Sequence, residues 1–283
     1  MSIFDSFAKK HDYLVCVDSD GCVMDTMNCK HFHCFGPCMV TEWGLDAWKD
    51  EILERWNVIN LFSMTRGINR FKGLAMALGE INEKYVPIVG IMHLQHWADS
   101  APALSNDAVA AAAVNAECEE AKIVFEKALS WSKAVNASIV KLPEELKVPY
   151  DGAKEGLAAA HSFADVAMVS SANRDAVEEE WGKFGLLEHT DIVLAQDIGS
   201  KAACIAEMLK FGYDLDKVVM VGDAPGDCDA VEKNHVWYYP ILVNHEKASW
   251  DEAIATAFGK LQAGEYAEYE ALKNKEFLAN LGG

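Results

Sequence analysis

The stretch from Tyr13 to Thr26 constrains the fold more than any other part of the sequence. Its first five residues are apolar and rich in β-branched and aromatic types, as in a strand buried on both faces of a sheet. Two aspartates, Asp18 and Asp20, follow at once, and Gly21 permits a sharp turn. Ligands bind at this end of a strand in open parallel sheets. We therefore expect a parallel sheet with a polar site where this strand ends.

Residues 28–157 are predicted to form a mainly helical domain. Apolar residues recur there at helical spacing, and the stretch 105–135 is rich in Ala, Glu and Lys, which favour helices. We expect a helix over 41–59, one long helix or two over 105–135, and an irregular connection over 86–104. Proline and glycine residues in 142–156 indicate a linker or hinge.

The chain beyond residue 157 has a different pattern. Four short apolar runs alternate with helical segments, at 166–169, 192–194, 218–221 and 236–243. This alternation is typical of parallel β–α units. Because the strand before Asp18 needs neighbours, we expect an α/β fold. A Rossmann-like parallel sheet would be built from 1–27 and 158–283, with the mainly α-helical segment 28–157 inserted as a cap. The helical tail, 248–281, is expected to pack on the core.

Several predicted strands end in polar groups that would meet at one edge of the sheet. Ser170 follows one apolar run, Asp223 follows another, and Lys201 begins the helix between them. The predicted crevice holds four carboxylates around this lysine: Asp18, Asp20, Asp223 and Asp227. So much like charge would force protonation unless a cation offset it. The sequence therefore predicts a Mg²⁺ site, since Mg²⁺ prefers oxygen ligands and is commonly shared with substrate phosphate.

These residues resemble the motifs of the haloacid dehalogenase-like (HAD) hydrolase superfamily. Four motifs carry the resemblance, in the family's order and spacing: Asp18-x-Asp20-Gly21, the strand-terminal Ser170, Lys201, and Gly222-Asp223-x-x-x-Asp227. The similarity covers about 1–27 and 158–245. The large insertion after the first motif also looks like the family's helical cap.

The resemblance implies a nucleophile, an acid–base group and a metal site. Asp18 would attack phosphorus to give an aspartyl-phosphate, and Asp20 would serve as general acid and then as general base. Mg²⁺ would bind the Asp18 carboxylate, the Asp20 backbone carbonyl and Asp223. Asp227 would be a further ligand or a partner of Lys201. The second aspartate of the first motif favours phosphoryl transfer over dehalogenation, because dehalogenases need no acid to protonate an alkoxide leaving group.

Phosphate oxygens would be held by Lys201 and by the hydroxyl of Ser170. Ser171 competes for the second role, and Ser170 is preferred because it directly follows the apolar run. The chain is thus expected to be a Mg²⁺-dependent phosphatase acting on a small phosphorylated metabolite. A phosphomutase of the β-phosphoglucomutase type shares the same core residues. A catalytically inactive binding protein is disfavoured by the intact motifs.

The charge and length of the chain limit its partners and location. The formal net charge is −19, which disfavours nucleic acid and anionic membranes, since both are bound through Lys and Arg. No apolar run approaches the roughly 20 residues that span a bilayer. The first eleven residues lack the apolar core of a signal peptide. We therefore expect a cytoplasmic protein whose eight cysteines are reduced thiols.

Two further groups in the predicted cap have competing interpretations. One is the set Cys29, His31, His33, Cys34 and Cys38, whose spacing matches no common structural zinc pattern. Packing near the cap hinge is the favoured interpretation, and metal binding is the alternative. The other is the pair Arg66 and Arg70, which forms either a solvated helix face or a surface that reads the substrate.

Overall fold

The computed structural model describes residues 3–282, and these divide into two compact units. Unit 1 contains the residues up to Met27 and those from Glu144 onward, and unit 2 contains Asn28–Pro143. Short 3₁₀ helices occur at Ile3–Ser6, Asp46–Trp48, Glu144–Leu146, Leu187–His189 and Leu215–Lys217. In the described part of the chain, no helix is long and apolar enough to cross a membrane.

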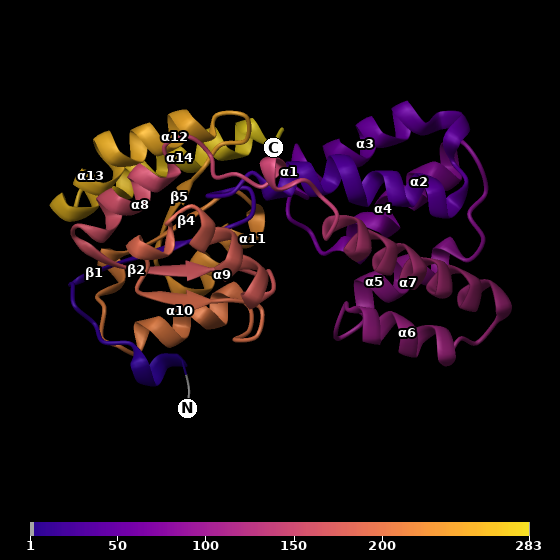
Figure 1. The fold of residues 1–283 in the computed structure, drawn as a ribbon, viewed down its shortest axis with the longest axis horizontal. Helices are drawn as coiled ribbons and strands as arrows, with labels where there is room; N and C mark the ends of the chain where they lie inside the picture. Colours follow the sequence, from indigo (N-terminus) through magenta and orange to yellow (C-terminus); the bar gives the residue numbers. More distant parts are fainter. Residues whose placement is uncertain (1–2, 283) are drawn as a thin grey trace. The chain divides into compact units, whose positions relative to one another are not determined.

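Unit 1 is built on a five-stranded parallel sheet (Figure 1). Its strands are β1 (Tyr13–Val17), β2 (Ala164–Val169), β3 (Ile192–Leu194), β4 (Val218–Gly222) and β5 (Trp237–Pro240). The order β3-β2-β1-β4-β5 puts β1 at the centre, with Val15 opposite Val166 on one side and Val219 on the other. The predicted α/β fold with a parallel sheet is confirmed.

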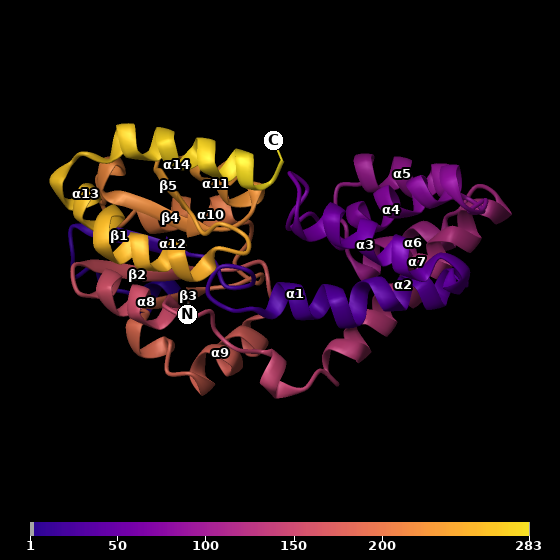
Figure 2. The ribbon, with the colours of Figure 1, turned by 90° about the horizontal axis from the view of Figure 1, so that it is seen from above.

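Both faces of the sheet are covered, which explains the continuous apolar runs of its strands. Side chains alternate between the faces, so Val15 and Val17 join one core cluster, whereas Leu14 and Cys16 are buried outside it. The helices of unit 1 are α8 (Ala153–His161), α9 (Arg174–Lys183), α10 (Lys201–Leu209), α11 (Pro225–Asn234), α12 (Glu246–Glu252), α13 (Phe258–Ala263) and α14 (Tyr266–Asn280), with a π-helical turn at Ala253–Ala257. The cluster that contains Val15 and Val17 includes residues of helices α8, α9, α12 and α13. Helix α10 contacts β2, and helix α11 contacts β4. Figure 2 shows these layers from a second direction.

Unit 2 is entirely helical in its regular structure. After α1 (Thr26–Lys30) and a π-helical turn (His31–Phe35), it contains α2 (Gly36–Trp43), α3 (Lys49–Leu61), α4 (Arg70–Lys84), α5 (Ile91–Ser100), α6 (Asn106–Val114) and α7 (Glu119–Ile139). Its core centres on Trp131, whose ring makes edge contacts with Phe35, Trp56 and Phe71. The mainly helical character predicted for this segment is confirmed.

Three expectations about its helices need comment. The single helix over 41–59 is wrong: Gly44 adopts φ 65° and its N–H caps α2, so the chain turns before α3 begins. The irregular stretch 86–104 is also wrong, since it contains α5. Residues 105–135 form two helices, α6 and α7, as one of the two alternatives stated.

The boundary between the units lies earlier than expected. Residues 144–157, assigned from sequence to the insertion, belong to unit 1. The reason is α8, which packs against β2 and α12. At Gly156 a Cβ atom would lie only 2.1 Å from the Trp250 ring, so this helix approaches α12 as closely as the missing side chain allows.

Candidate active site

The loop after β1 forms a tight turn at the carboxyl edge of the sheet. Asp18 continues the strand pairing, because its N–H donates to the Val221 carbonyl at 2.9 Å. Gly21 adopts φ 88°, the left-handed conformation expected of a glycine here. The Ser19 carbonyl then accepts hydrogen bonds from Val23 and Met24 at 3.0 and 2.9 Å. The Asp18 side chain therefore sits at the end of the central strand on a closed, well-bonded turn.

Lys201 joins the carboxylates of two separate motifs. Its Nζ lies 2.7 Å from Asp18 Oδ2 and 2.6 Å from Asp227 Oδ1. Lys201 is the first residue of α10, which Ser200 caps by accepting a hydrogen bond from the Ala203 N–H at 3.3 Å. Burial alone would lower the pKa of Lys201, but the Asp18 and Asp227 carboxylates hold it above its ordinary value. The lysine is therefore a fixed positive charge in the site.

Asp227 is fixed from its other side by the start of α11. Its Oδ2 accepts hydrogen bonds from the N–H groups of Asp223 and Ala224 at 3.2 and 3.1 Å. A Cβ atom at Gly222 would lie 2.4 Å from Asp227 Cγ, so only glycine fits at that position. The spacing of the Gly222-Asp223-x-x-x-Asp227 motif thus follows from a carboxylate folding back over the end of β4.

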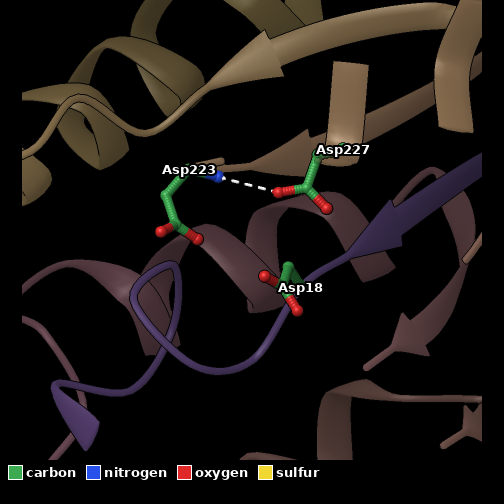
Figure 3. Close-up of side chains that lie close together, drawn as sticks. All are labelled: Asp18, Asp223 and Asp227. Atoms are coloured by element: carbon green, nitrogen blue, oxygen red, sulfur yellow. Dashed lines mark hydrogen bonds between the residues drawn. The ribbon is translucent and has the colours of Figure 1, made fainter. Parts of the chain in front are cut away.

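The three carboxylates of Asp18, Asp223 and Asp227 converge, as Figure 3 shows. They are buried, and one oxygen from each lies within 4.8 Å of the others. Within residues 3–282 this is the only such group of three or more potential ligand residues. Burial raises the pKa of Asp18 well above its usual value; Lys201 lowers it, and Asp227 and Asp223 raise it further.

This arrangement fits a divalent cation. Three buried carboxylates face a single lysine, and the ionised form of Asp18 is disfavoured by burial. An ion with a preference for oxygen ligands would offset the remaining negative charge. Asp18 and Asp227 each bond at both carboxylate oxygens. Asp18 bonds to Lys201 and the Ser19 N–H, and Asp227 bonds to Lys201 and to the N–H groups of Asp223 and Ala224.

The remaining predicted residues of unit 1, Asp20 and Ser170, lie in the loops after β1 and β2. The Asp20 carboxylate accepts a hydrogen bond from the Thr26 hydroxyl. Ser170 is buried, and its Oγ accepts a hydrogen bond from the Ala172 N–H at 3.1 Å, which leaves its own proton to donate. Ser171 is exposed. The geometry therefore supports Ser170 over Ser171 as the strand-terminal hydroxyl.

Arg66 and Arg70 lie in unit 2, and their environments differ from a solvated helix face. Arg66 is 2% exposed and donates to the Leu61 carbonyl at 2.8 Å. Arg70 donates to Ser132 Oγ and Asn136 Oδ1 at 3.0 and 2.7 Å. The solvated alternative is therefore wrong for Arg66. A role of either residue in reading the substrate stays a prediction.

The cysteine and histidine residues at 29–38 form part of a helical segment. His31 Nδ1 accepts a hydrogen bond from the Trp56 indole at 3.1 Å, and its ring stacks on Phe35. Cys34 is buried in the core of unit 2. These contacts agree with the packing interpretation. None of the chain's cysteines forms a disulfide in the described residues.

Sequence reasoning missed the residues that hold the turn after β1. Asp25 accepts a hydrogen bond from the Tyr150 hydroxyl at 3.0 Å. Trp181 and Trp250 donate their indole N–H groups to Ser19 Oγ and the Cys22 carbonyl. No local pattern signals these contacts, because the partners are more than a hundred residues apart.

Comparison with known proteins gives one family and several solved structures. A family model described as haloacid dehalogenase-like hydrolase matches residues 104–238. Similar solved structures include a haloacid dehalogenase-like family hydrolase from Streptococcus pneumoniae, with 9% identity and a TM-score of 0.45 over 84% of this chain and 90% of that one. A predicted phosphoglycolate phosphatase from Haemophilus somnus 129pt has 13% identity and a TM-score of 0.44 over 81% and 84%. A protein provisionally assigned as a β-phosphoglucomutase from Thermotoga maritima has 14% identity and a TM-score of 0.48 over 81% and 84%. No curated protein sequence matches the chain.

Proposed function

We propose that this chain is a Mg²⁺-dependent phosphatase of a small phosphorylated metabolite. Its motifs predicted a haloacid dehalogenase-like hydrolase, and the family match confirms that prediction. The observation that carries the proposal is the position of Asp18. Its carboxylate lies at the end of the central strand, 2.7 Å from Lys201 Nζ and beside the carboxylates of Asp223 and Asp227. A carboxylate with a fixed cation beside it suits attack on a phosphoryl group.

The first half of the reaction uses Asp18 and Asp20. An Asp18 oxygen attacks phosphorus, the bond to the ester oxygen breaks, and an aspartyl-phosphate remains. The Asp20 carboxyl donates its proton to the departing oxygen. Its hydrogen bond from Thr26 orients this group within the turn. In the second half Asp20 accepts a proton from water, which attacks the phosphorus and releases inorganic phosphate and the free Asp18 carboxylate.

Phosphate oxygens are bound by two groups of unit 1. Lys201 supplies a positive charge, and Ser170 can donate its hydroxyl proton, because the Ser170 oxygen already accepts from Ala172. Both act where negative charge develops in the transition state. Bound Mg²⁺, held by the Asp18 and Asp223 carboxylates and the Asp20 carbonyl, would supply further charge neutralisation for the phosphoryl group.

The test is a panel of phosphate monoesters assayed with and without Mg²⁺. We expect hydrolysis by the wild-type chain, loss of activity with a chelator, and a fall of at least about a thousandfold in kcat for Asp18→Asn. Asp12→Asn is the matched control, because it changes an exposed carboxylate just before β1 in the same way. Its activity should stay within a few-fold of wild type.

Two results would contradict the proposal. Undiminished hydrolysis by Asp18→Asn would falsify the role of Asp18 as nucleophile. Transfer of phosphate between positions of a sugar phosphate, with no release of inorganic phosphate from any ester, would identify a phosphomutase.

The proposed reading of the substrate by unit 2 is tested separately with Arg66→Ala and Arg70→Ala. Unaltered kcat/KM on the substrate found in the panel would exclude it.

A further inference from the structure

The turn that carries Asp18 and Asp20 is anchored by two buried tryptophans from distant helices. Trp181 of α9 donates its indole N–H to Ser19 Oγ at 2.8 Å. Trp250 of α12 donates to the Cys22 carbonyl at 3.1 Å. Both side chains are at most 1% exposed, so their N–H groups depend on these acceptors. Each contact therefore fixes one point of the turn.

Ser19 is the centre of this turn, and all its polar groups are engaged. Its N–H donates to Asp18 Oδ1 at 2.7 Å. Its carbonyl accepts from the N–H groups of Val23 and Met24 at 3.0 and 2.9 Å. Its hydroxyl oxygen accepts from Trp181. A rotation of Ser19 would therefore move both the N–H beside Asp18 and the turn that carries Asp20.

Helix α9 also connects this contact to the loop after β2. The helix begins at Arg174, three residues beyond Ser171, and Asn173 caps it by accepting from the Ala176 N–H at 3.3 Å. The loop of Ser170 and the Trp181 indole therefore belong to one short segment. A shift of this helix would change the positions of Ser170 and Ser19 together.

We propose that Trp181 is a positioning residue of the phosphoryl-transfer site, which acts through Ser19 Oγ on the orientation of Asp18. The proposal rests on the proposed function. The Trp181 indole bonds to Ser19 Oγ, so its effect on Asp18 passes through Ser19. Its ring fills the core beside β1, and a purely structural role would require only the ring. The indole N–H is the group that distinguishes positioning from packing.

The kinetic test removes that N–H and its acceptor separately and together. We expect Trp181→Phe to lower kcat about 10- to 100-fold with KM changed less than about threefold, because small misplacements of reacting groups cost this much. Ser19→Ala should have a similar effect. The double variant should be no slower than the slower single variant, since both changes break one contact.

Trp131→Phe is the matched control. Trp131 is also fully buried, and its indole donates to the Phe35 carbonyl at 3.1 Å in unit 2. The same loss of volume and of one N–H is expected there without a loss of kcat. Equal losses of kcat in Trp131→Phe and Trp181→Phe, or additive losses in Trp181→Phe and Ser19→Ala, would overturn the proposal.

Hydrogen–deuterium exchange gives a second readout that needs no substrate. In Trp181→Phe and in Ser19→Ala, amides in the peptide covering 18–24 should exchange faster, with peptides of unit 2 unchanged. Unchanged exchange in 18–24 would also overturn the proposal. A wild-type chain that hydrolyses no phosphate ester would contradict the proposed function alone, because exchange would still decide whether Trp181 holds the turn. Ser19→Ala tests the contact if Trp181→Phe does not fold.

Discussion

At the scale of single residues, the candidate site depends on glycine positions where an added Cβ atom would displace a charged side chain. Gly222 is the clearest case. A Cβ atom there would lie 2.4 Å from Asp227 Cγ, and Asp227 is the residue that holds Lys201 opposite Asp18. The sequence motif shows a glycine and an aspartate at a fixed spacing. The structure supplies the reason, which is the folding of that carboxylate over the strand end.

Gly222→Ala should therefore damage the site more than the fold. The methyl group would push Asp227 away from Lys201, so we expect kcat/KM to fall about 10- to 100-fold. Gly226→Ala is the control within the same motif, since a Cβ atom there meets nothing within 4 Å. That change, in the first turn of α11, should leave kcat/KM unchanged. Steady-state kinetics and thermal melting of both variants would check this, and equal effects would contradict it.

At the scale of elements, strands were easier to predict than helix ends. The runs that became β1, β2 and β4 are short, apolar and directly followed by motif residues, so local sequence defines them. Helix α5 is missing from the prediction because Pro87, Gly90 and Pro102 locally favour irregular structure. All three lie outside it: Gly90 is its N-cap with φ 77°, and Pro102 follows its end.

The predicted boundary after residue 157 is wrong for the same reason. Pro149 and Gly152 precede α8, and Gly152 is its N-cap with φ 87°. The site itself was largely predictable, because the motif residues are local to strand ends. The anchoring of the turn was not, because the Trp181–Ser19 contact depends on tertiary packing between residues far apart in the sequence.

The amino end of the sheet provides a prediction about pH. Asp191 precedes β3, and its Oδ2 accepts from the Val166 N–H at 2.9 Å and lies 3.2 Å from His161 Nε2. Its Oδ1 lies 2.6 Å from Lys10 Nζ. Burial would raise the pKa of Asp191, but Lys10, the Val166 N–H and His161 together hold it below its ordinary value.

Because the folded pKa of Asp191 is depressed, its stabilisation is present above the unfolded value of about 3.9 and is lost as pH falls through the folded pKa. Asp191→Asn should lower the free energy of unfolding by about 1–3 kcal/mol at neutral pH. The difference from wild type should shrink as pH falls below the unfolded value of about 3.9. Asp12→Asn, at an exposed position, should change stability by less than about 0.5 kcal/mol. Urea unfolding at several pH values measures both, and a deficit that grows in acid would contradict the assignment.

At the scale of the whole molecule, the net charge of −19 opposes the approach of an anionic substrate. The site compensates locally with Lys201, but the long-range field remains negative. Salt shortens the range of that field, from about 30 Å at 10 mM to about 8 Å at 150 mM.

We therefore expect kcat/KM for a phosphate monoester to rise a few-fold between about 10 and 150 mM NaCl, because repulsion is screened. Saturating Mg²⁺ should be held constant so that only the screening changes. The rise should appear in KM and leave kcat nearly unaltered. A steady fall in kcat/KM with salt would instead indicate that local attraction by the site dominates the encounter.

The central place of β1 also affects how the chain can form during synthesis. The strand is made first, yet its two neighbours, β2 and β4, lie beyond residue 163. Unit 2 is continuous in sequence from Asn28 to Pro143, so its core can close while β1 is still without either neighbour. At ribosomal rates of about 5–20 residues per second, β1 waits roughly ten seconds or more for β4. The turn that carries Asp18 is thus synthesised before unit 2 but gains its neighbouring strands only after unit 2.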